Sequence, residues 1–155
     1  MDVLVKFAVR YNAAAHRLLA SHDLTPALYS CKRVISVTFM VVMQYIPQSE
    51  GTSLCYASLS PPAIETVRRD VSRALELLHG QNLVFGDLRE SNVLYLPDKG
   101  RAMLVDFDDV GRDGEDRYPA FPDPEAELGV VRLQIMGRSH DVENFGRLMN
   151  RISEL

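Results

Sequence analysis

The chain has 155 residues, enough for one domain with a buried core, and 46% hydrophobic with 25% charged residues is ordinary for a globular protein. No apolar run is long enough to cross a bilayer and the N-terminal residues lack a signal-peptide pattern, so we expect no membrane partner. Cys31 and Cys55 have neither metal-binding nor disulfide spacing, which favours an intracellular protein, cytoplasmic or nuclear.

The net charge of −4 is unevenly spread along the sequence. Residues 106–127 contain nine acidic and two basic side chains, a charge of −7, which leaves +3 for the remainder. Because no concentrated basic face is present in the sequence pattern, we expect no nucleic-acid partner. We interpret the acidic run as a solvated loop, some of whose acids could hold a metal ion.

The sequence pattern of the first 53 residues predicts several strands, one helix and a linker. Ala15, Leu18 and Leu19 recur on one face of the helix, and the neighbouring alanines favour helix formation. The pair Thr25-Pro26 then interrupts regular structure. The expected elements are a strand at 3–7, a helix at 11–21, strands at 27–31 and 38–46, and a polar linker at 47–53.

A longer amphipathic helix is predicted after this linker. Ser60 is a good N-cap, the two prolines after it suit a first helical turn, and Gly80 ends the pattern. Apolar residues at spacings of three and four predict one buried face, made of Ile64, Val67, Val71, Ala74, Leu75 and Leu78. The face expected in solvent carries Glu65, Arg68, Arg69 and Asp70.

Short strands and loops are predicted between this helix and a final one. Strands are expected at 83–84, 93–96 and 102–105, and the turn at 97–100 joins the last two into a hairpin. A long loop is predicted from Asp109 to Gly129. The final helix, at 141–152, is expected to bury Val142, Phe145, Leu148, Met149 and Ile152.

The stretch 83–108 contains the residues with the clearest chemistry. Asp87 follows a buried strand, Asn92 lies five residues later, and the hairpin should return Asp106 to the neighbourhood of Asn92. An amide oxygen and a carboxylate are ligands that suit Mg²⁺. Asp87 would then be free to orient an attacking hydroxyl and accept its proton, while Arg89 could neutralise charge on a phosphoryl group.

The residues of this stretch and the segments around it resemble those of a protein kinase-like domain. The chain is especially similar to the kinase-like proteins of filamentous and mushroom-forming fungi. The segments that carry the resemblance are VLVK, FMVVMQYI, LELLHGQNLVFGDLRESNVL, VDFD and HDVENFGRLM. The resemblance implies an α+β, two-lobed fold in a single partial domain at 1–155. Residues 1–46 would be the remnant of the small lobe with the hinge, and 47–155 the start of the large lobe.

The resemblance implies catalytic and metal-binding roles in the central stretch. Asp87 matches the catalytic base, Arg89 the lysine of the catalytic loop, and Asn92 the metal-binding asparagine. Asp106 matches the Mg²⁺-binding aspartate of the DFG motif. Asp141 matches an aspartate that braces the catalytic loop.

The resemblance also implies ATP as a cofactor together with Mg²⁺. Lys6 would contact the nucleotide phosphates, Met43 would be the gatekeeper, and Leu94 would form the floor under the adenine. The backbone that meets the adenine edge would come from Gln44, Tyr45 and Ile46.

The sequence departs from the family pattern at several positions. It begins at the lysine strand, without the glycine-rich strands, and ends within the bracing helix, so we expect both lobes to be truncated. Ala14 stands where the family has an acid that pairs with the lysine, and we therefore expect an unpaired Lys6. Phe85 and Gly86 replace the His and Arg before the catalytic aspartate. Asp108 replaces the DFG glycine, and we expect it and the acid after it to be solvated.

The implied function is that of an ATP-dependent phosphotransferase of the protein kinase type, which transfers the γ-phosphoryl group to a Ser/Thr-type hydroxyl. Because of the departures from the family pattern, we expect this activity to be weak or absent. The acceptor, a protein or a small molecule, stays open. Gly before Asp87 and an acid after the DF pair also resemble aminoglycoside- and choline-type small-molecule kinases. A non-catalytic, pseudokinase-like binding protein or a gene fragment is the third interpretation.

Overall fold

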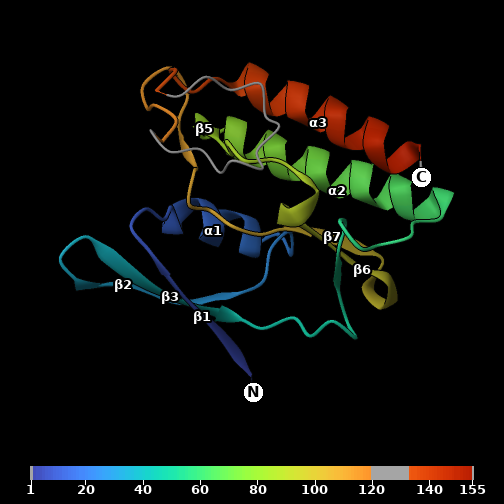
Figure 1. Cartoon of the computed structure of the whole chain (residues 1–155), viewed down its shortest axis with the longest axis horizontal. Coiled ribbons are helices and arrows are strands. Elements are labelled where there is room, and N and C mark those ends of the chain that lie inside the picture. The colour runs from blue at the N-terminus through green and yellow to red at the C-terminus, as the bar shows by residue number, and fades with distance from the viewer. Residues whose placement is uncertain (1, 120–132, 155) are drawn as a thin grey trace.

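The structure is a computed structural model that describes residues 2–119 and 133–154. An antiparallel sheet of order β1–β3–β2 occupies one side of the molecule (Figure 1). Its strands are β1 (Val3–Ala8), β2 (Leu28–Ile35) and β3 (Thr38–Gln44), which confirms the three predicted strands and lengthens the second. In this register Lys6 lies opposite Val41, whose side chain is fully buried, so Lys6 is on the inward face of the sheet.

Helix α1 (Ala13–Ala20) follows β1 and packs between this sheet and the rest of the molecule. The side chain of Asn12 caps the helix by accepting a hydrogen bond of 2.9 Å from the backbone N–H of Ala15. His16 and Leu19 are buried on its inner face together with Ala15. The helix predicted at 11–21 is therefore present, slightly shorter at both ends.

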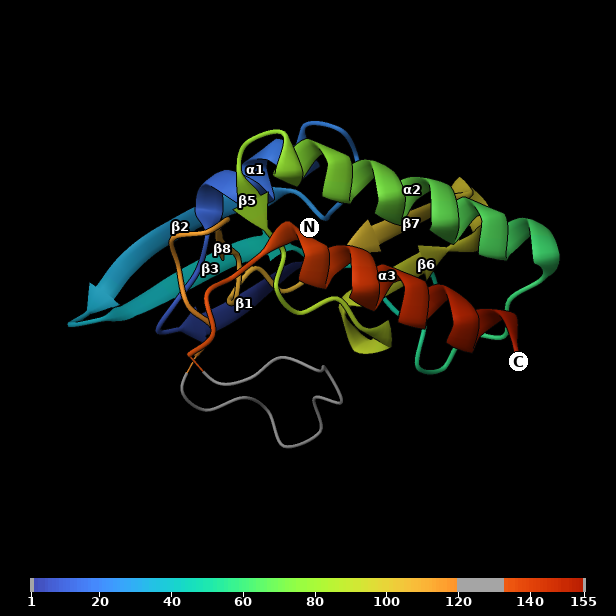
Figure 2. The ribbon, with the colours of Figure 1, turned by 90° about the horizontal axis from the view of Figure 1, so that it is seen from above.

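Helices α2 (Pro61–His79) and α3 (Arg138–Ser153) lie side by side over the remaining strands (Figures 1 and 2). Ser60 is the N-cap of α2, as predicted, and accepts a hydrogen bond from the Ala63 N–H. Two predictions about exposure are wrong. Asp70 is 4% exposed and accepts a 2.9 Å bond from the Ala102 N–H, and Val142 is 61% exposed.

The remaining strands are short and form two small sheets. One sheet has the order β4–β6–β7, formed by β4 (Thr52–Ser53), β6 (Val93–Leu96) and β7 (Arg101–Leu104). A second pairs β5 (Leu83–Val84) with β8 (Gly111–Arg112). The predicted hairpin is confirmed, whereas β4 lies in the expected linker and β8 in the expected long loop. The part of that loop at 120–132 lies outside the described residues.

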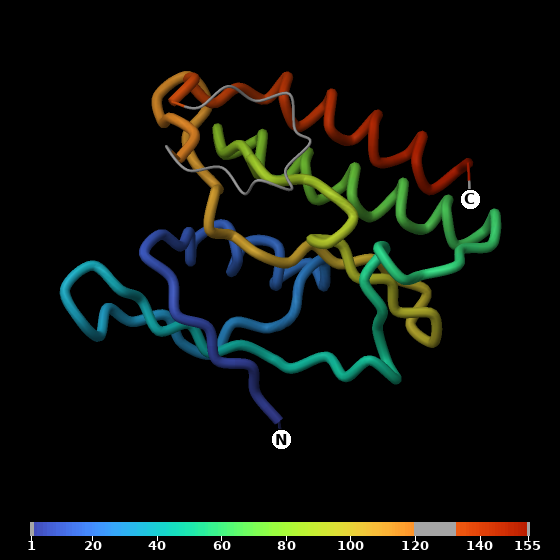
Figure 3. Tube along the Cα trace, viewed as in Figure 1, coloured from blue at the N-terminus to red at the C-terminus, as the bar shows by residue number. Residues whose placement is uncertain are grey.

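One hydrophobic cluster joins α1, α2, α3 and the β6–β7 hairpin. The trace in Figure 3 shows the segment after β7 leaving the hairpin and passing α1. The backbone N–H of Asn12 donates a 3.1 Å bond to the Phe107 carbonyl at this crossing. Among the described helices, none combines the length and apolar character needed to cross a bilayer.

Candidate functional site

The loop after β5 places Asp87 and Asn92 next to each other. The amide nitrogen of Asn92 donates to the Asp87 backbone carbonyl at 2.9 Å and to its Oδ2 at 2.8 Å. The other carboxylate oxygen of Asp87, Oδ1, lies 3.3 Å from Nε of Arg89. Because the Asn92 nitrogen makes both bonds, a cation would be bound by its amide oxygen.

A buried carboxylate on α3 holds the start of this loop. Asp141 is fully buried and accepts hydrogen bonds from the backbone N–H groups of Phe85, at 2.8 Å, and Gly86, at 3.0 Å. His79 at the end of α2 lies 2.9 Å from the same carboxylate. Gly86 has a φ of +86°, and a Cβ there would lie 2.7 Å from the Asp109 carbonyl oxygen, so the loop needs glycine at this position.

The β6–β7 hairpin brings Asp106 back to this loop, as predicted. The Val105 N–H donates a 2.9 Å bond to the Asn92 carbonyl, directly before Asp106. Asp106 has a φ of +71°, a conformation that is strained for most residues but which Asp tolerates. Its Oδ1 accepts the backbone N–H of Asp108 at 3.2 Å, which stabilises the turn.

Lys6 reaches the same place from β1, and the expectation that it is unpaired is wrong. Its ammonium donates a 2.9 Å hydrogen bond to Asp106 Oδ1 and lies 2.8 Å from Asp108 Oδ1. The ring of Tyr11 lies 6.0 Å from the ammonium. The expectation that Asp108 is a solvated loop acid is also wrong, because this carboxylate is half-buried against Lys6.

The electrostatics of the four carboxylates differ. Burial raises the pKa of Asp87 above its ordinary value, and burial likewise raises the pKa of Asp109. Burial alone would raise the pKa of Asp106, but the hydrogen bond and charge of Lys6 outweigh burial and hold it below its usual range. Asp108 has a pKa raised to about 6, chiefly by burial, with the charge of Asp106 contributing.

The predicted hinge residues follow at the end of β3. Met43 is buried and lies on the same face of the sheet as Lys6, since Lys6 pairs with Val41 two residues before it. The Gln44 N–H donates to the Ala27 carbonyl at 2.8 Å, so it is already engaged within the protein.

Three further residues were predicted to contact the nucleotide, two through their backbone and one as the floor under the adenine. Tyr45 and Ile46 continue from β3 outside any strand, and Leu94, half-buried, pairs with Met103 in the β6–β7 hairpin. The nucleotide roles of Tyr45, Ile46 and Leu94 stay predictions.

Aromatic stacking links α1 to the site, which the sequence did not indicate. The rings of His16 and Phe107 stack with centroids 4.7 Å apart, and Phe85 meets Phe107 edge-on at 5.8 Å. His16 Nε2 donates to the Pro26 carbonyl at 2.7 Å, so its Nδ1 accepts from the Tyr11 hydroxyl at 2.6 Å. Burial lowers the pKa of His16 and so favours the neutral ring. The signal available was a histidine on the apolar face of the predicted helix.

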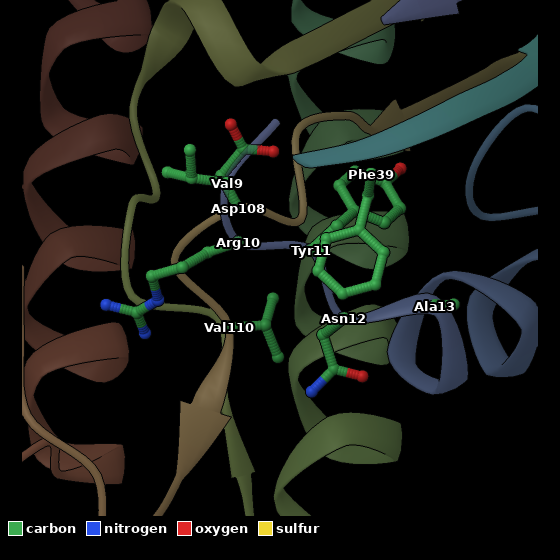
Figure 4. A pocket seen from close by; sticks show the side chains of 8 residues that line it. All are labelled: Val9, Arg10, Tyr11, Asn12, Ala13, Phe39, Asp108 and Val110. Carbon is green, nitrogen blue, oxygen red and sulfur yellow. The ribbon is translucent and has the colours of Figure 1, made fainter. Parts of the chain in front are cut away.

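A pocket of about 440 Å³ opens beside Asp108 (Figure 4). It is lined by Val9, Arg10, Tyr11, Asn12, Ala13, Phe39, Asp108 and Val110. Figure 4 shows Arg10 and the aromatic rings on opposite sides, with Val110 between them. The lining therefore combines the charged side chains of Arg10 and Asp108 and the amide of Asn12 with apolar and aromatic residues.

The oxygen atoms at the site fit a hard cation that is completed by other ligands. Within residues 2–119 and 133–154, no three His, Cys, Asp or Glu side chains gather as a metal site. Asp106 supplies a carboxylate with a lowered pKa, and Asn92 supplies an amide oxygen. Mg²⁺ commonly takes one or two protein carboxylates and fills its other positions with water and phosphate oxygens, which suits this donor set.

Comparisons with known proteins place this geometry in context. No family model matches the sequence. The chain is 29% identical over 103 residues to a putative serine/threonine-protein kinase, F31E3.2, of Caenorhabditis elegans, covering 64% of this chain and 23% of that protein. It is 33% identical over 84 residues to the serine/threonine/tyrosine-protein kinase HT1 of Arabidopsis thaliana, covering 50% of this chain and 20% of that protein.

A solved structure has the same fold. The Cydia pomonella granulovirus kinase PK-1 matches with a TM-score of 0.74 at 20% identity, over 97% of this chain and 58% of the viral chain. The matched segments span less than a quarter of the two curated relatives. The chain is therefore a protein kinase-like domain with a mixed α and β kinase-like fold.

Proposed function

We propose that this domain binds ATP with Mg²⁺ and transfers the γ-phosphoryl group to a hydroxyl. The observation that carries the proposal is the meeting of Lys6, Asp106, Asn92 and Asp87 at one place, although they come from distant parts of the chain. A cation, two carboxylates and an amide are the groups that phosphoryl transfer uses for phosphate binding, metal binding and acceptance of the hydroxyl proton.

Each residue has a distinct role in this proposal. Asn92 and Asp106 hold Mg²⁺, which when bound neutralises charge on the phosphates. Lys6 contacts the phosphates, and Arg89 places a second cation beside Asp87. Asp87 orients the acceptor hydroxyl and takes its proton, a task helped by its raised pKa.

The nucleotide base would lie further along the same face of the sheet. Met43 would border the adenine, with Leu94 beneath it and the backbone of Tyr45 and Ile46 at its edge. The Gln44 N–H is engaged with Ala27, so we assign the hinge contacts chiefly to the two residues after it. In this arrangement residues 1–46 act as the small lobe and 47–155 as the large lobe.

Thermal stability measured against MgATP concentration tests the binding step. We expect a rise in melting temperature that needs both ATP and Mg²⁺ and that is lost in Asp106→Asn. Asp87→Asn should retain this rise but lose transfer of labelled γ-phosphate to a mixed peptide library. No stabilisation at millimolar MgATP would refute the proposal, and binding without transfer in the parent chain would reduce the domain to a non-catalytic nucleotide binder.

A second candidate is phosphoryl transfer to a small hydroxylated molecule. It is favoured by the pocket beside Asp108, whose volume of about 440 Å³ lies in the range of small-molecule sites. Arg10 and Asn12 offer it polar contacts. Aminoglycosides and choline-like alcohols, assayed beside the peptide library, distinguish the two candidates, because Arg10→Ala should impair only small-molecule transfer.

A further inference from the structure

Helix α1 carries no acidic side chain that could pair with Lys6. Its sequence is AAAHRLLA. Ala14, in its first turn, stands where the kinase resemblance implies an acid that pairs with the lysine. The inner face of α1 instead presents His16 to Phe107. A buried or half-buried ammonium needs a partner, because leaving it desolvated and unpaired would be costly.

Asp108 supplies this partner from a different segment. The positive φ of Asp106 turns the chain sharply, and the bond from the Asp108 N–H to Asp106 Oδ1 fixes the turn. The Asp108 side chain then reaches Lys6, with 2.8 Å between Oδ1 and the ammonium and 34% of the side chain exposed. Lys6 is thereby held between two carboxylates that lie two residues apart.

We infer that Asp108 is the positioning residue for Lys6, acting from the segment that also carries Asp106 and not from α1. The inference deepens the proposed function, on which its role in nucleotide binding rests. The contact itself, in which the Asp108 carboxylate holds the Lys6 ammonium, does not depend on a bound nucleotide.

The consequence concerns how α1 is coupled to the site. α1 is joined to this segment through Phe107, by the bond from the Asn12 N–H and by the stacked ring of His16. Lys6 is joined to the same segment through Asp106 and Asp108. Both α1 and Lys6 are therefore coupled through residues 106–108, so a change in that segment alters the contacts of both.

Amine labelling of the whole chain tests the geometric content without nucleotide. The rate at which a sulfosuccinimidyl ester modifies Lys6, measured by mass spectrometry, should rise about two- to fivefold in Asp108→Asn, the factor expected for loss of a partly exposed ion pair. Lys32 and Lys99 serve as internal references, and Asp109→Asn is the matched control, in which the Lys6 rate should stay near that of the parent. An unchanged Lys6 rate in Asp108→Asn overturns the inference.

Affinity for MgATP, measured by titration calorimetry in a double-mutant cycle, tests the functional content. Asp108→Asn should weaken binding about fivefold in the parent background and less than about twofold when Lys6 is already Met, because the effect acts through Lys6. Equal weakening in both backgrounds, or tighter binding in Asp108→Asn, overturns the positioning role. If the parent binds no MgATP while labelling responds as expected, the proposed function fails and the pairing of Lys6 by Asp108 stands.

Discussion

The two sides of the candidate site are held by different means. The loop that carries Asp87 and Asn92 is anchored to helix α3, because the fully buried Asp141 accepts hydrogen bonds from backbone N–H groups at the start of that loop. Lys6 comes from β1, an edge strand of its sheet, where Val5 and Phe7 are 49% and 63% exposed. The core fixes the carboxylate and amide, whereas the cation depends on its ion-pair partners. Mutations on the two sides should therefore differ strongly in their cost.

The largest effect is expected from Asp141→Ala. The substitution leaves the buried N–H groups of Phe85 and Gly86 without their acceptor and removes the partner of His79. We expect a loss of about 3–5 kcal/mol in the free energy of unfolding, measured by urea titration. Glu143→Ala on the same helix, at an exposed position, is the control and should cost less than about 0.5 kcal/mol. A small loss in Asp141→Ala would show that the loop is held by other contacts.

A second substitution on the anchored side separates conformation from steric contact. Gly86→Ala should cost about 2–3 kcal/mol in unfolding free energy, because Ala is strained at φ of +86° and its Cβ meets the Asp109 carbonyl oxygen. Gly100 also has a positive φ, of +55°, but an added Cβ there has no neighbour within 4 Å. Gly100→Ala should therefore cost about 1 kcal/mol from conformation alone. Equal losses in the two variants would argue against the close approach at Gly86.

The pH dependence of stability should include a contribution from His16, whose ring stacks on Phe107. Its pKa is lowered by burial from 6.5, so the folded protein resists protonation of this ring while the unfolded chain does not. The contribution of His16 is constant above pH 6.5 and is lost as pH falls from 6.5 through the lowered folded pKa, by up to about 1.4 kcal/mol per pH unit.

His16→Gln should flatten this part of the stability profile relative to the parent chain, whereas His22→Gln, at an exposed position beyond the same helix, should not. Taking the difference between parent and variant removes the opposite trend from Asp108, whose raised pKa makes stability fall as pH rises. Parallel profiles for parent and His16→Gln would show that His16 is accessible to protons in the folded state.

Local patterns in the sequence were sufficient for the elements with strong periodicity or capping. The Ser60 cap, the long helix after it and the β6–β7 hairpin were all predicted, as was the proximity of Asn92 and Asp106. The two-residue strands β4 and β8 were missed because, unlike the equally short β5, they contain no apolar residue. The prediction that Asp70 faces solvent was wrong, because it lies three residues after Val67 and four before Ala74, on the buried face.

The contacts of Lys6 could not be predicted in the same way. The lysine and Asp106 are 100 residues apart, so their pairing depends on the register of β1 with β3 and on the sharp turn at Asp106. The sequence identified an acid missing from α1 but contained no local signal that Asp108 would replace it. Long-range ion pairs of this kind follow from the assembled fold rather than from any one segment.

The smallest effect on stability is expected from Lys6→Met, the substitution that removes the cation itself. The side chains of Lys6, Asp106 and Asp108 are 27%, 37% and 34% exposed, so water and salt screen their interaction. We expect a loss below about 1 kcal/mol in unfolding free energy, and the loss should shrink further at about 1 M salt. Lys99→Met, which removes an ammonium 3.7 Å from Glu50, is the matched control. A loss as large as that of Asp141→Ala would mean that β1, despite its exposed outer face, is held as firmly as the loop that carries Asp87 and Asn92.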